Sequence, residues 1–190
     1  MPLANAKSNI NKNTPNGWFL AGTHPAEYKA TLDRKIFHSG TRSCRVSSIV
    51  KEASGWTTLM QNIGPVPYLG KRLRMKFWVR TEEVGYVCGW MRVDGPERGK
   101  MLAFDNMCKR HLQGTHDWLE QEIVLDVPDE STNIGFGVIF NGLGKMWADD
   151  VSFELVDQSV PVTQCRRMTP NIYDTPPKNL NFESDETGDT

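Results

Sequence analysis

The stretch Tyr86-Val87-Cys88-Gly89-Trp90-Met91-Arg92-Val93-Asp94 decides the fold, because its side chains alternate as those of a β-strand do. Val87, Met91 and Val93 make one apolar face, whereas the other face carries two aromatic rings, a guanidinium and a carboxylate. Since successive side chains of a strand project to opposite sides of its sheet, one face can enter a core. The other face is either a ligand platform of rings and hydrogen-bonding groups or an ordinary outer face partly covered by a loop.

Further segments outside this stretch also favour extended structure. They are rich in Val, Ile, Phe and Trp, most of them alternate, and turn residues such as Gly64-Pro65 and Asn141-Gly142 separate them. These segments are 17–21, 42–50, 56–63, 72–80, 101–107, 119–127, 134–140 and 147–156. No stretch keeps a helical period for three turns, although 24–33 has room for a short turn of helix. The pattern predicts an all-β protein, an antiparallel sandwich or barrel.

The segment 134–140 carries apolar side chains on both faces, which predicts a central strand. Gly135 and Gly137 lie on the less apolar face. Glycines inside a strand mark either the close approach of a ligand or another backbone, or a bulge or bend in the strand. The sequence leaves both interpretations open.

Composition narrows the classes of partner. The chain has 190 residues with a net charge of -1, and no basic excess indicates a nucleic-acid partner. No apolar run approaches the length that spans a bilayer, so no membrane partner is expected. The first residues, Met1 to Lys7, lack the apolar region of a secretory signal, which favours a cytoplasmic location.

No catalytic constellation stands out in the sequence. Neither a GxSxG nor an HExxH motif occurs, and His111 and His116 are a poor basis for a metal site. We therefore expect a protein that is not an enzyme and that requires no cofactor. An accessory role beside a sugar-processing enzyme stays open.

The order and spacing of many short motifs resemble those of the galactose-binding-like jelly rolls, and within them the carbohydrate-binding modules found with xylanases. The similarity covers roughly residues 16–156 and extends to an uncharacterised bacterial group of standalone or regulator-fused domains. It rests on Asn16-Gly17-Trp18-Phe19, Gln61-Asn62-Ile63, Trp90-Met91-Arg92-Val93-Asp94-Gly95, Phe104-Asp105-Asn106-Met107 and Trp147-Ala148-Asp149-Asp150-Val151. The resemblance implies an antiparallel two-sheet jelly-roll sandwich with one concave face.

On that face the resemblance implies a site for a carbohydrate or a similar small polar ligand. Trp90, Arg92 and Asn106 are the first candidates. The secondary candidates are Tyr86, Trp56, Gln61, Asp105 and Asn141. The chemistry of the residues agrees, because sugar rings stack on indoles and their hydroxyl groups need Arg, Asp, Asn or Gln as partners. A second interpretation makes Arg92 and Asp105 a buried ion pair that fixes strand register.

The resemblance also implies a structural calcium site. By simple alternation Asp149 shares a face with Val151 and Phe153, and a carboxylate on a core face needs a partner. The similar modules bind Ca²⁺ with such an Asp and with carbonyls of a nearby Ser-Gly turn, which correspond to Asp149 and to the turn from Gly40 to Ser43. The acidic ligand expected from the opening strand is missing here, and calcium needs six to eight oxygens. Arg42, Lys35 or backbone donors are the alternative partners of Asp149.

Three parts of the chain follow from these observations: an N-terminal arm over 1–15, the sandwich over 16–156 and a proline-containing tail over 157–190. Within the tail, residues 179–183 look like the opening strand of the same fold and are expected to add as an edge strand. The alternative to saccharide binding is a regulatory or scaffolding module that binds a protein partner and forms a homo-oligomer through this tail.

Overall fold

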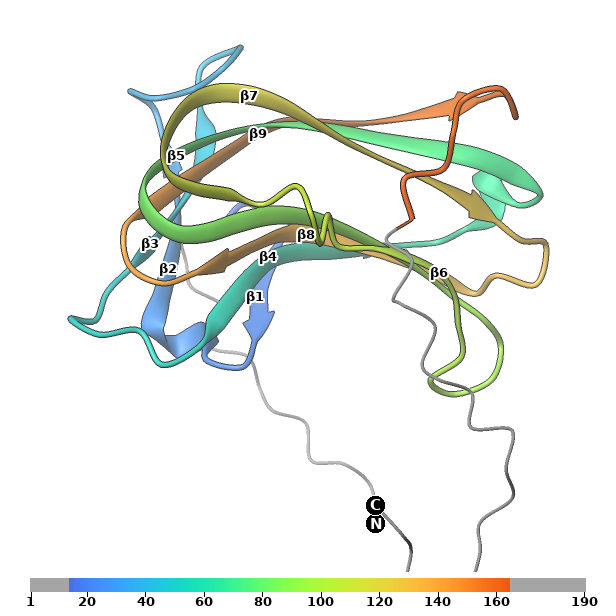
Figure 1. Cartoon of the computed structure of the whole chain (residues 1–190), viewed down its shortest axis with the longest axis horizontal. Coiled ribbons are helices and arrows are strands. Elements are labelled where there is room, and N and C mark those ends of the chain that lie inside the picture. Colours follow the sequence, from blue (N-terminus) through green and yellow to red (C-terminus); the bar gives the residue numbers. More distant parts are fainter. Residues whose placement is uncertain (1–13, 165–190) are drawn as a thin grey trace, which may run out of the picture.

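The computed structural model of the chain describes residues 14–164, which are almost entirely β-strand (Figure 1). In this part of the chain, no helix is long and apolar enough to cross a membrane. Two short 3-10 helices, η1 (Pro25–Glu27) and η2 (Val66–Tyr68), interrupt the strands. The strands are β1 (Phe19–Gly22), β2 (Tyr28–Asp33), β3 (Ser43–Ser48), β4 (Trp56–Ile63), β5 (Lys71–Asp94), β6 (Met101–Asp105), β7 (Leu112–Val127), β8 (Asn133–Asn141) and β9 (Lys145–Val156).

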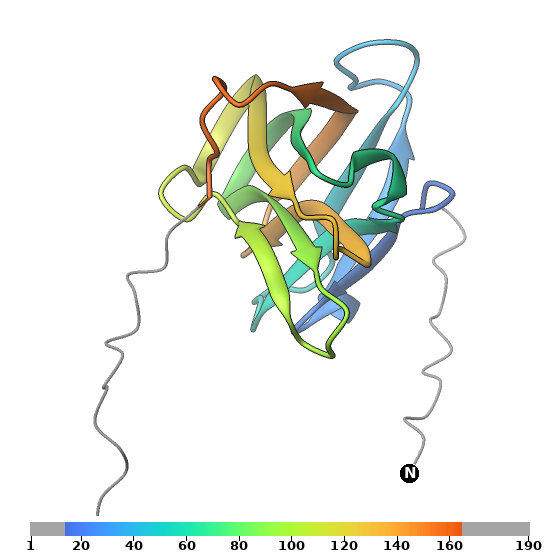
Figure 2. The same ribbon diagram turned by 90° about the vertical axis from the view of Figure 1, so that its right-hand side faces the viewer.

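The strands form two layers that share one long strand, as Figures 1 and 2 show. The first half of β5, up to Glu82, pairs with β9, and its second half, from Tyr86, pairs with β8. The first layer is therefore β2-β3-β9-β5-β7 and the second layer is β1-β4-β8-β5-β6. Every one of these pairings is antiparallel. The all-β antiparallel sandwich predicted from the sequence is confirmed.

Two of the predicted segments are parts of one strand. The segments 72–80 and 86–94 are the two halves of β5, because the strand continues through residues 81–85 with shifts in register and a positive φ of 53° at Glu83. The short turn of helix for which 24–33 had room is present as η1 (Pro25–Glu27), and the strand β2, which the sequence did not predict, follows from Tyr28 to Asp33. Its Tyr28 and Ala30 are buried and Lys29 is exposed, so the alternation was present, but Ala and Lys are weak strand formers.

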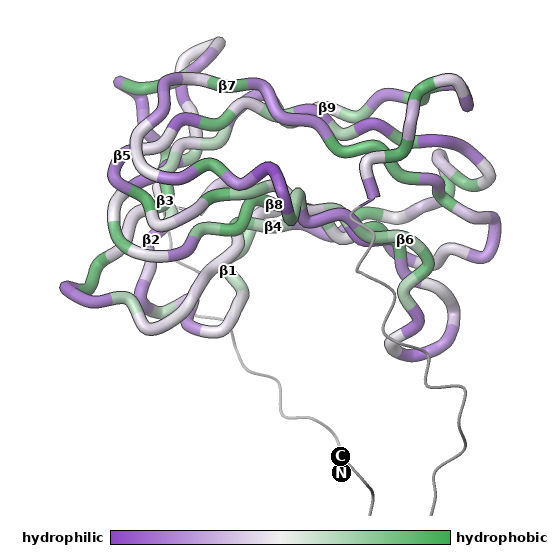
Figure 3. Tube along the Cα trace, viewed as in Figure 1, coloured by the Kyte–Doolittle hydropathy of each residue, from purple (hydrophilic) through white to green (hydrophobic). Residues whose placement is uncertain are grey.

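The core lies between the two layers and is built from alternate positions of the strands, an alternation that Figure 3 shows in its coloured trace. Leu73, Met75 and Phe77 of β5 are at most 1% exposed. On the second layer Gly89 leaves room for Phe77: a Cβ on Gly89 would lie 2.3 Å from the Cζ atom of that ring. The absence of a side chain at this position therefore sets how closely the layers pack.

The free edge of β7 is covered by side chains and by the segment that follows β9. The Arg110 guanidinium donates to the Glu122 carbonyl at 2.9 Å. The Val124 amide donates to Thr163 Oγ1 at 2.9 Å, and the Thr163 amide donates to the Val124 carbonyl at 2.9 Å. An uncovered strand edge pairs readily with other chains, so these contacts protect the sheet from edge-to-edge association.

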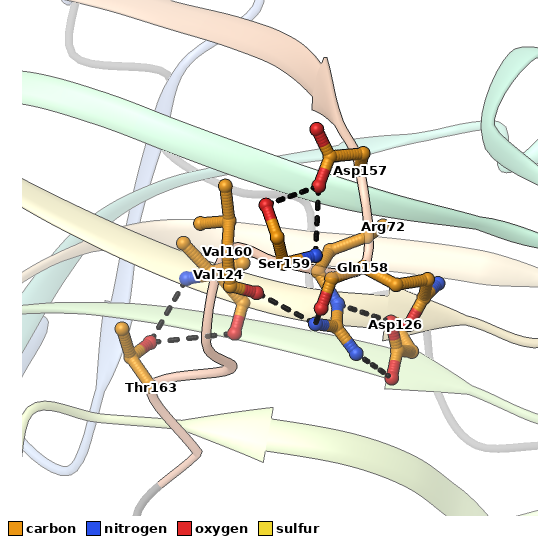
Figure 4. A network of polar contacts seen from close by, with 8 residues as sticks. All are labelled: Arg72, Val124, Asp126, Asp157, Gln158, Ser159, Val160 and Thr163. Carbon is orange, nitrogen blue, oxygen red and sulfur yellow. Dashed lines mark hydrogen bonds and ion pairs between the residues drawn. The ribbon is translucent and has the colours of Figure 1, made fainter.

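The segment 157–164 is held on the first layer by Arg72 (Figure 4). The Arg72 guanidinium donates to both carboxylate oxygens of Asp126, at 2.8 and 3.0 Å. Its third nitrogen donates to the carbonyl oxygens of Gln158 and Val160, at 3.0 and 2.6 Å. One arginine thus joins β5, β7 and the segment after β9, and a two-point Arg–carboxylate pair of this kind fixes geometry as well as charge.

Candidate functional site

The outer face of the second layer holds most of the side chains that the sequence nominated, and we call it the Trp90 face. The register places its residues in rows across β4, β8 and β5. The members are Trp56, Thr58, Met60 and Asn62 of β4, Asn133, Gly135, Gly137, Ile139 and Asn141 of β8, Tyr86, Cys88, Trp90, Arg92 and Asp94 of β5, and Phe104 of β6. Figure 1 shows loops at both ends of the second layer projecting beyond this face.

Trp90 forms the floor of the face. Its partner across the sheet is Gly137, and a Cβ on the neighbouring Gly135 would lie 3.3 Å from its ring. The indole reaches across β8 to β4, where its Nε1 donates to Thr58 Oγ1 at 2.7 Å. The ring is only 8% exposed, so it is a fixed apolar support and offers little free surface for stacking.

The two glycines of β8 provide the space for this arrangement. The register of β8 with both neighbouring strands is unbroken from Asn133 to Asn141, so no bulge is present. A Cβ on Gly137 would lie 2.3 Å from the Leu59 carbonyl oxygen. Of the two interpretations left open by the sequence, close approach of a backbone and a ring is the correct one.

A polar cluster lies beside Trp90 at one end of the face. Arg92 Nε donates to Asp94 Oδ1 at 2.8 Å, and Arg92 Nη2 donates to Asp94 Oδ2 at 3.2 Å. Asn133 Nδ2 donates to the same carboxylate at 2.9 Å and contacts Asn62 Oδ1 at 3.4 Å. The Arg92 side chain is 45% exposed and that of Asp94 23%. The cluster therefore presents donors and acceptors to solvent without a net charge.

Aromatic side chains mark the opposite end of the face. One row joins Trp56, Asn141 and Tyr86, all three of them partly exposed. The Tyr86 ring stacks on His111 with 5.0 Å between the ring centroids. Six residues separate this row from the row of Asn62 and Arg92 along each strand, which corresponds to about 20 Å. The face is thus long enough for a ligand of more than one ring.

Asp105, a candidate from the sequence, lies away from this surface. It pairs with Met91 in the register and its side chain is 1% exposed. One carboxylate oxygen accepts the Met107 amide at 2.7 Å and the other accepts Arg110 Nη2 at 2.7 Å. The second interpretation, a buried Arg92–Asp105 ion pair, is wrong, because Asp105 pairs with Arg110 and Arg92 pairs with Asp94. Asn106, the next residue, is partly exposed just beyond the end of β6.

Gln61 lies in a different place, because it alternates to the other side of β4. It lines a pocket of about 350 Å³ at the open end between the two layers, together with Trp18, Tyr68, Phe136 and Phe153. The structure therefore places Trp90, Arg92, Tyr86, Trp56 and Asn141 on one face of the sheet, with Asn106 just beyond the end of β6, and it places Gln61 and Asp105 elsewhere.

The residues nominated for calcium, Asp149 and the turn from Gly40 to Ser43, lie at the loop that joins β2 to β3. Asp149 Oδ2 accepts the amides of His38 and Ser39 at 2.8 and 3.3 Å, and its Oδ1 accepts the Asp150 amide at 2.9 Å. Ser43 Oγ donates to the Ile36 carbonyl at 2.6 Å. Backbone donors, one of the three alternative partners, thus satisfy Asp149. Among residues 14–164 no three His, Cys, Asp or Glu side chains cluster as a metal site. Calcium bound by Asp149 and the turn from Gly40 to Ser43 stays a prediction.

The face assignment of Asp149 was wrong because of a bulge. Asp150 has a φ of 50°, and the register shifts at this point. Asp149 is opposite Trp78 on the outer face of the first layer, whereas Phe153 is opposite the buried Met75. A bulge adds one residue to a strand, so the side chains before and after it no longer follow one alternation.

The chemistry of the Trp90 face suits binding more than catalysis. Burial, with a smaller contribution from the Asp105 charge, raises the pKa of the Cys88 thiol to about 12, so the thiol stays protonated and is a poor nucleophile. Burial also raises the pKa of Tyr86. Amides, one paired guanidinium and partly exposed rings remain, and these groups hold a ligand by hydrogen bonds and stacking.

Sequence reasoning missed three polar members of the site. Thr58, Asn62 and Asn133 were not nominated, although Asn133 and Asn62 extend the Arg92–Asp94 pair and Thr58 anchors Trp90. Each lies on a different strand from β5, so only cross-strand register brings it near. The alternation of β4 could have identified two of them, because it places Thr58 and Asn62 on the face opposite the buried Leu59.

A sequence of known description is similar to this chain over most of the chain's length. No protein-family model matches the chain. The uncharacterised HTH-type transcriptional regulator YbfP of Bacillus subtilis (strain 168) is 41% identical over 171 residues, which are 89% of this chain and 57% of the regulator. The chain therefore spans little more than half the length of that relative.

Solved structures with a similar fold include modules named for carbohydrate binding. The C-terminal family 22 carbohydrate-binding module of Clostridium thermocellum Xyn10B has a TM-score of 0.54 at 12% identity, covering 78% of this chain and 91% of the module. The xylan-binding domain CBM22-1 of Paenibacillus barcinonensis Xyn10C has a TM-score of 0.56 at 12% identity, covering 77% and 90%.

The same architecture also occurs within an enzyme. The enzymatically active domain of bacteriophage CBA120 tailspike protein 4 has a TM-score of 0.57 at 14% identity, covering 74% of this chain but 20% of that one. At these identities the likeness concerns the fold alone. The chain has the β-sandwich fold of the carbohydrate-binding modules, as the motifs predicted.

Proposed function

We propose that this chain is a non-catalytic module that binds an uncharged saccharide of more than one ring on the Trp90 face. The observation that carries the proposal is the pairing of Arg92 with Asp94, extended by Asn133 and Asn62, beside an indole fixed in the sheet. Such a cluster provides donors and acceptors for vicinal hydroxyl groups. Because the guanidinium is neutralised by its own carboxylate, the face favours a neutral ligand over an anionic one.

Two further observations support this function. The solved modules of the same fold are named as carbohydrate-binding and xylan-binding domains. The Cys88 thiol stays protonated and the Asp94 carboxylate is paired with Arg92, so these groups of the face favour binding over catalysis. Likeness to a protein described as a transcriptional regulator further suggests a cytoplasmic domain that senses its ligand.

A glycan array followed by calorimetric titration tests the proposal. Neutral oligosaccharides that bind the intact protein are titrated into Arg92→Ala and Asn62→Ala, with Arg74→Ala as the matched control on the outer face of the first layer. Loss of a hydrogen bond to a charged group costs about 1.5–3 kcal/mol, so we expect Arg92→Ala to weaken binding by about 10- to 100-fold. Arg74→Ala should bind as the wild type does. An array without any ligand, or equal losses in Arg92→Ala and Arg74→Ala, would refute saccharide binding at this face.

A further inference from the structure

The Phe19 ring is exposed at the edge strand of the second layer. Phe19 is the first residue of β1 and is 41% exposed, whereas the next residue, Leu20, packs against the core. Successive side chains of a strand point to opposite sides of the sheet, so Phe19 points away from the core. The register agrees, because Phe19 pairs with Met60, a member of the Trp90 face. Phe19 therefore belongs to this face as well.

Phe19 completes an apolar row that crosses the second layer. From β1 to β5 the register aligns Phe19, Met60, Gly137 and Trp90. Gly137 adds no side chain to the row, and the Trp90 indole is only 8% exposed. Phe19 is thus the most exposed side chain of the row. It offers the free aromatic surface for stacking that the buried indole lacks.

A polar row lies beside this apolar row. Two residues further along the strands, about 7 Å away, the register aligns Asn62, Gly135 and Arg92. Asn62 is exposed and is the diagonal neighbour of Phe19 across the β1–β4 pair, a separation that an aromatic side chain can bridge. Asn62 Oδ1 accepts from Asn133 Nδ2 at 3.4 Å, whereas Asn62 Nδ2 bonds no residue of the range 14–164. The Asn62 amide donors are therefore available beside the Phe19 ring.

The two rows match the two kinds of surface on a pyranose. The C–H groups of the sugar make an apolar face, which stacks on an aromatic ring, and its hydroxyl groups project from the rim as donors and acceptors. Phenylalanine carries no polar atom, so the Phe19 ring contributes apolar contact alone. Asn62 supplies the hydrogen bonds at the rim of a sugar that lies on this ring.

We propose that Phe19 is the stacking ring of the saccharide site and that Asn62 binds the hydroxyl groups of the same sugar unit. The inference rests on the proposed function and assigns the chemical class of this unit: a pyranose with one C–H face free of substituents, because a substituent there would hold the two rings apart. Arg92 lies two strands from Asn62, about 10 Å away, and is left for a neighbouring unit of the same oligosaccharide.

Calorimetric titration with neutral tetrasaccharides tests the stacking contact. The probes are cellotetraose, xylotetraose and β-1,4-linked galactotetraose, which consist of pyranoses, and α-1,5-linked arabinotetraose, which consists of furanoses. We expect Phe19→Ala and Phe19→Leu to bind the preferred pyranose probe on the order of 10-fold more weakly than the wild type, and Phe19→Trp to retain the affinity. The furanose probe should bind more weakly than that pyranose probe. Equal affinity for the two classes would contradict the assignment of a pyranose.

The matched control is Phe37→Ala, which removes a ring of similar exposure, 37%, from the loop between β2 and β3. It should bind as the wild type does. Undiminished binding by Phe19→Ala overturns the proposal, and so does an equal loss in Phe37→Ala.

A double variant tests whether Phe19 and Asn62 contact one sugar unit. Phe19→Ala and Asn62→Ala together should weaken binding by less than the product of the two single effects, because either change already disturbs the shared unit. Strict multiplication of the effects would contradict the shared contact. Arg92→Ala separates this inference from the function on which it rests. If Arg92→Ala weakens binding and Phe19→Ala does not, the Phe19 contact alone is wrong, whereas a wild type that binds none of the probes contradicts both.

Discussion

Trp90 shows how one buried hydrogen bond organises a polar surface. The sequence placed this residue correctly on the face opposite the core, but its exposure could not be read from alternation. The structure turns the ring onto the glycines of β8 and satisfies its Nε1 with Thr58. The indole therefore fixes the positions of its neighbours, and under the proposed function Arg92 and Asn62 are the groups that contact the ligand.

The Trp90–Thr58 bond predicts a measurable coupling at the residue scale. Thr58→Val leaves the Nε1 donor buried without a partner, so we expect a loss of about 1–3 kcal/mol in the free energy of unfolding. Trp90→Phe should lose more, because it also leaves a cavity. Chemical denaturation of both single variants and of the double variant gives the coupling energy. Strict additivity of the two losses would show that the bond does not contribute.

Asp33 predicts the sign of an acid dependence. Its carboxylate accepts Trp147 Nε1 at 3.0 Å and the amides of Lys35 and Ile36. These hydrogen bonds, that from Trp147 foremost, lower the pKa of Asp33 from 3.8. Since the folded pKa is the lower one, the stabilisation is present above pH 3.8 and disappears as the pH falls through the folded value.

Substitution of Asp33 should remove part of that dependence. We expect Asp33→Asn to lower the free energy of unfolding by about 1–3 kcal/mol at pH 7 and by much less at pH 2.5. Urea unfolding at both pH values measures the difference between the two proteins. The expectation fails if the gap between wild type and variant is the same at both pH values.

At the scale of elements, the spacing of the layers depends on Gly89. A methyl group there would overlap the Phe77 ring, so Gly89→Ala should lower the free energy of unfolding by about 1–3 kcal/mol. Gly64→Ala is the matched control, because a Cβ at that position meets nothing within 4 Å. Thermal or chemical unfolding checks both. If Gly89→Ala left the free energy of unfolding unchanged, the layers would be able to move apart without loss of stability, which would contradict this account.

The segment after β9 gives a second prediction for an element. Arg72→Ala removes the bonds to Gln158 and Val160, so the Val124 amide should lose its cover and exchange its hydrogen faster. Arg74→Ala is the control, since Arg74 pairs with Glu122 and Glu154 and does not hold this segment. Hydrogen exchange read by NMR gives both rates. Equal rates at Val124 in the two variants would contradict the role given to Arg72.

The elements also show what a sequence can and cannot supply. Alternation located most of the strands and the core positions, because a period of two is a local property. It missed β2, whose Ala30 and Lys29 are weak strand formers, and it failed at Asp150, where a bulge changes the alternation. The polar site needed cross-strand register, so Asn62 and Asn133 were invisible while Asp105 and Gln61 were assigned to a face that they do not reach.

For the whole molecule, six tryptophans report on separate regions. Trp56 and Trp90 belong to the Trp90 face, and Trp18 lines the pocket at the open end between the two layers. The remaining three, Trp78, Trp118 and Trp147, belong to the first layer, where His38 stacks on Trp78 and contacts Trp118. The fold therefore distributes its indoles so that one spectrum separates the candidate binding surfaces.

The most direct test of saccharide binding is a ¹H–¹⁵N spectrum of the six indole groups during titration with a neutral oligosaccharide. We predict that the signals of Trp56 and Trp90 shift in a saturable manner while those of Trp78, Trp118 and Trp147 stay in place. Shifts confined to Trp18 or to the three indoles of the first layer would contradict binding at the Trp90 face, and so would a spectrum that no neutral oligosaccharide changes.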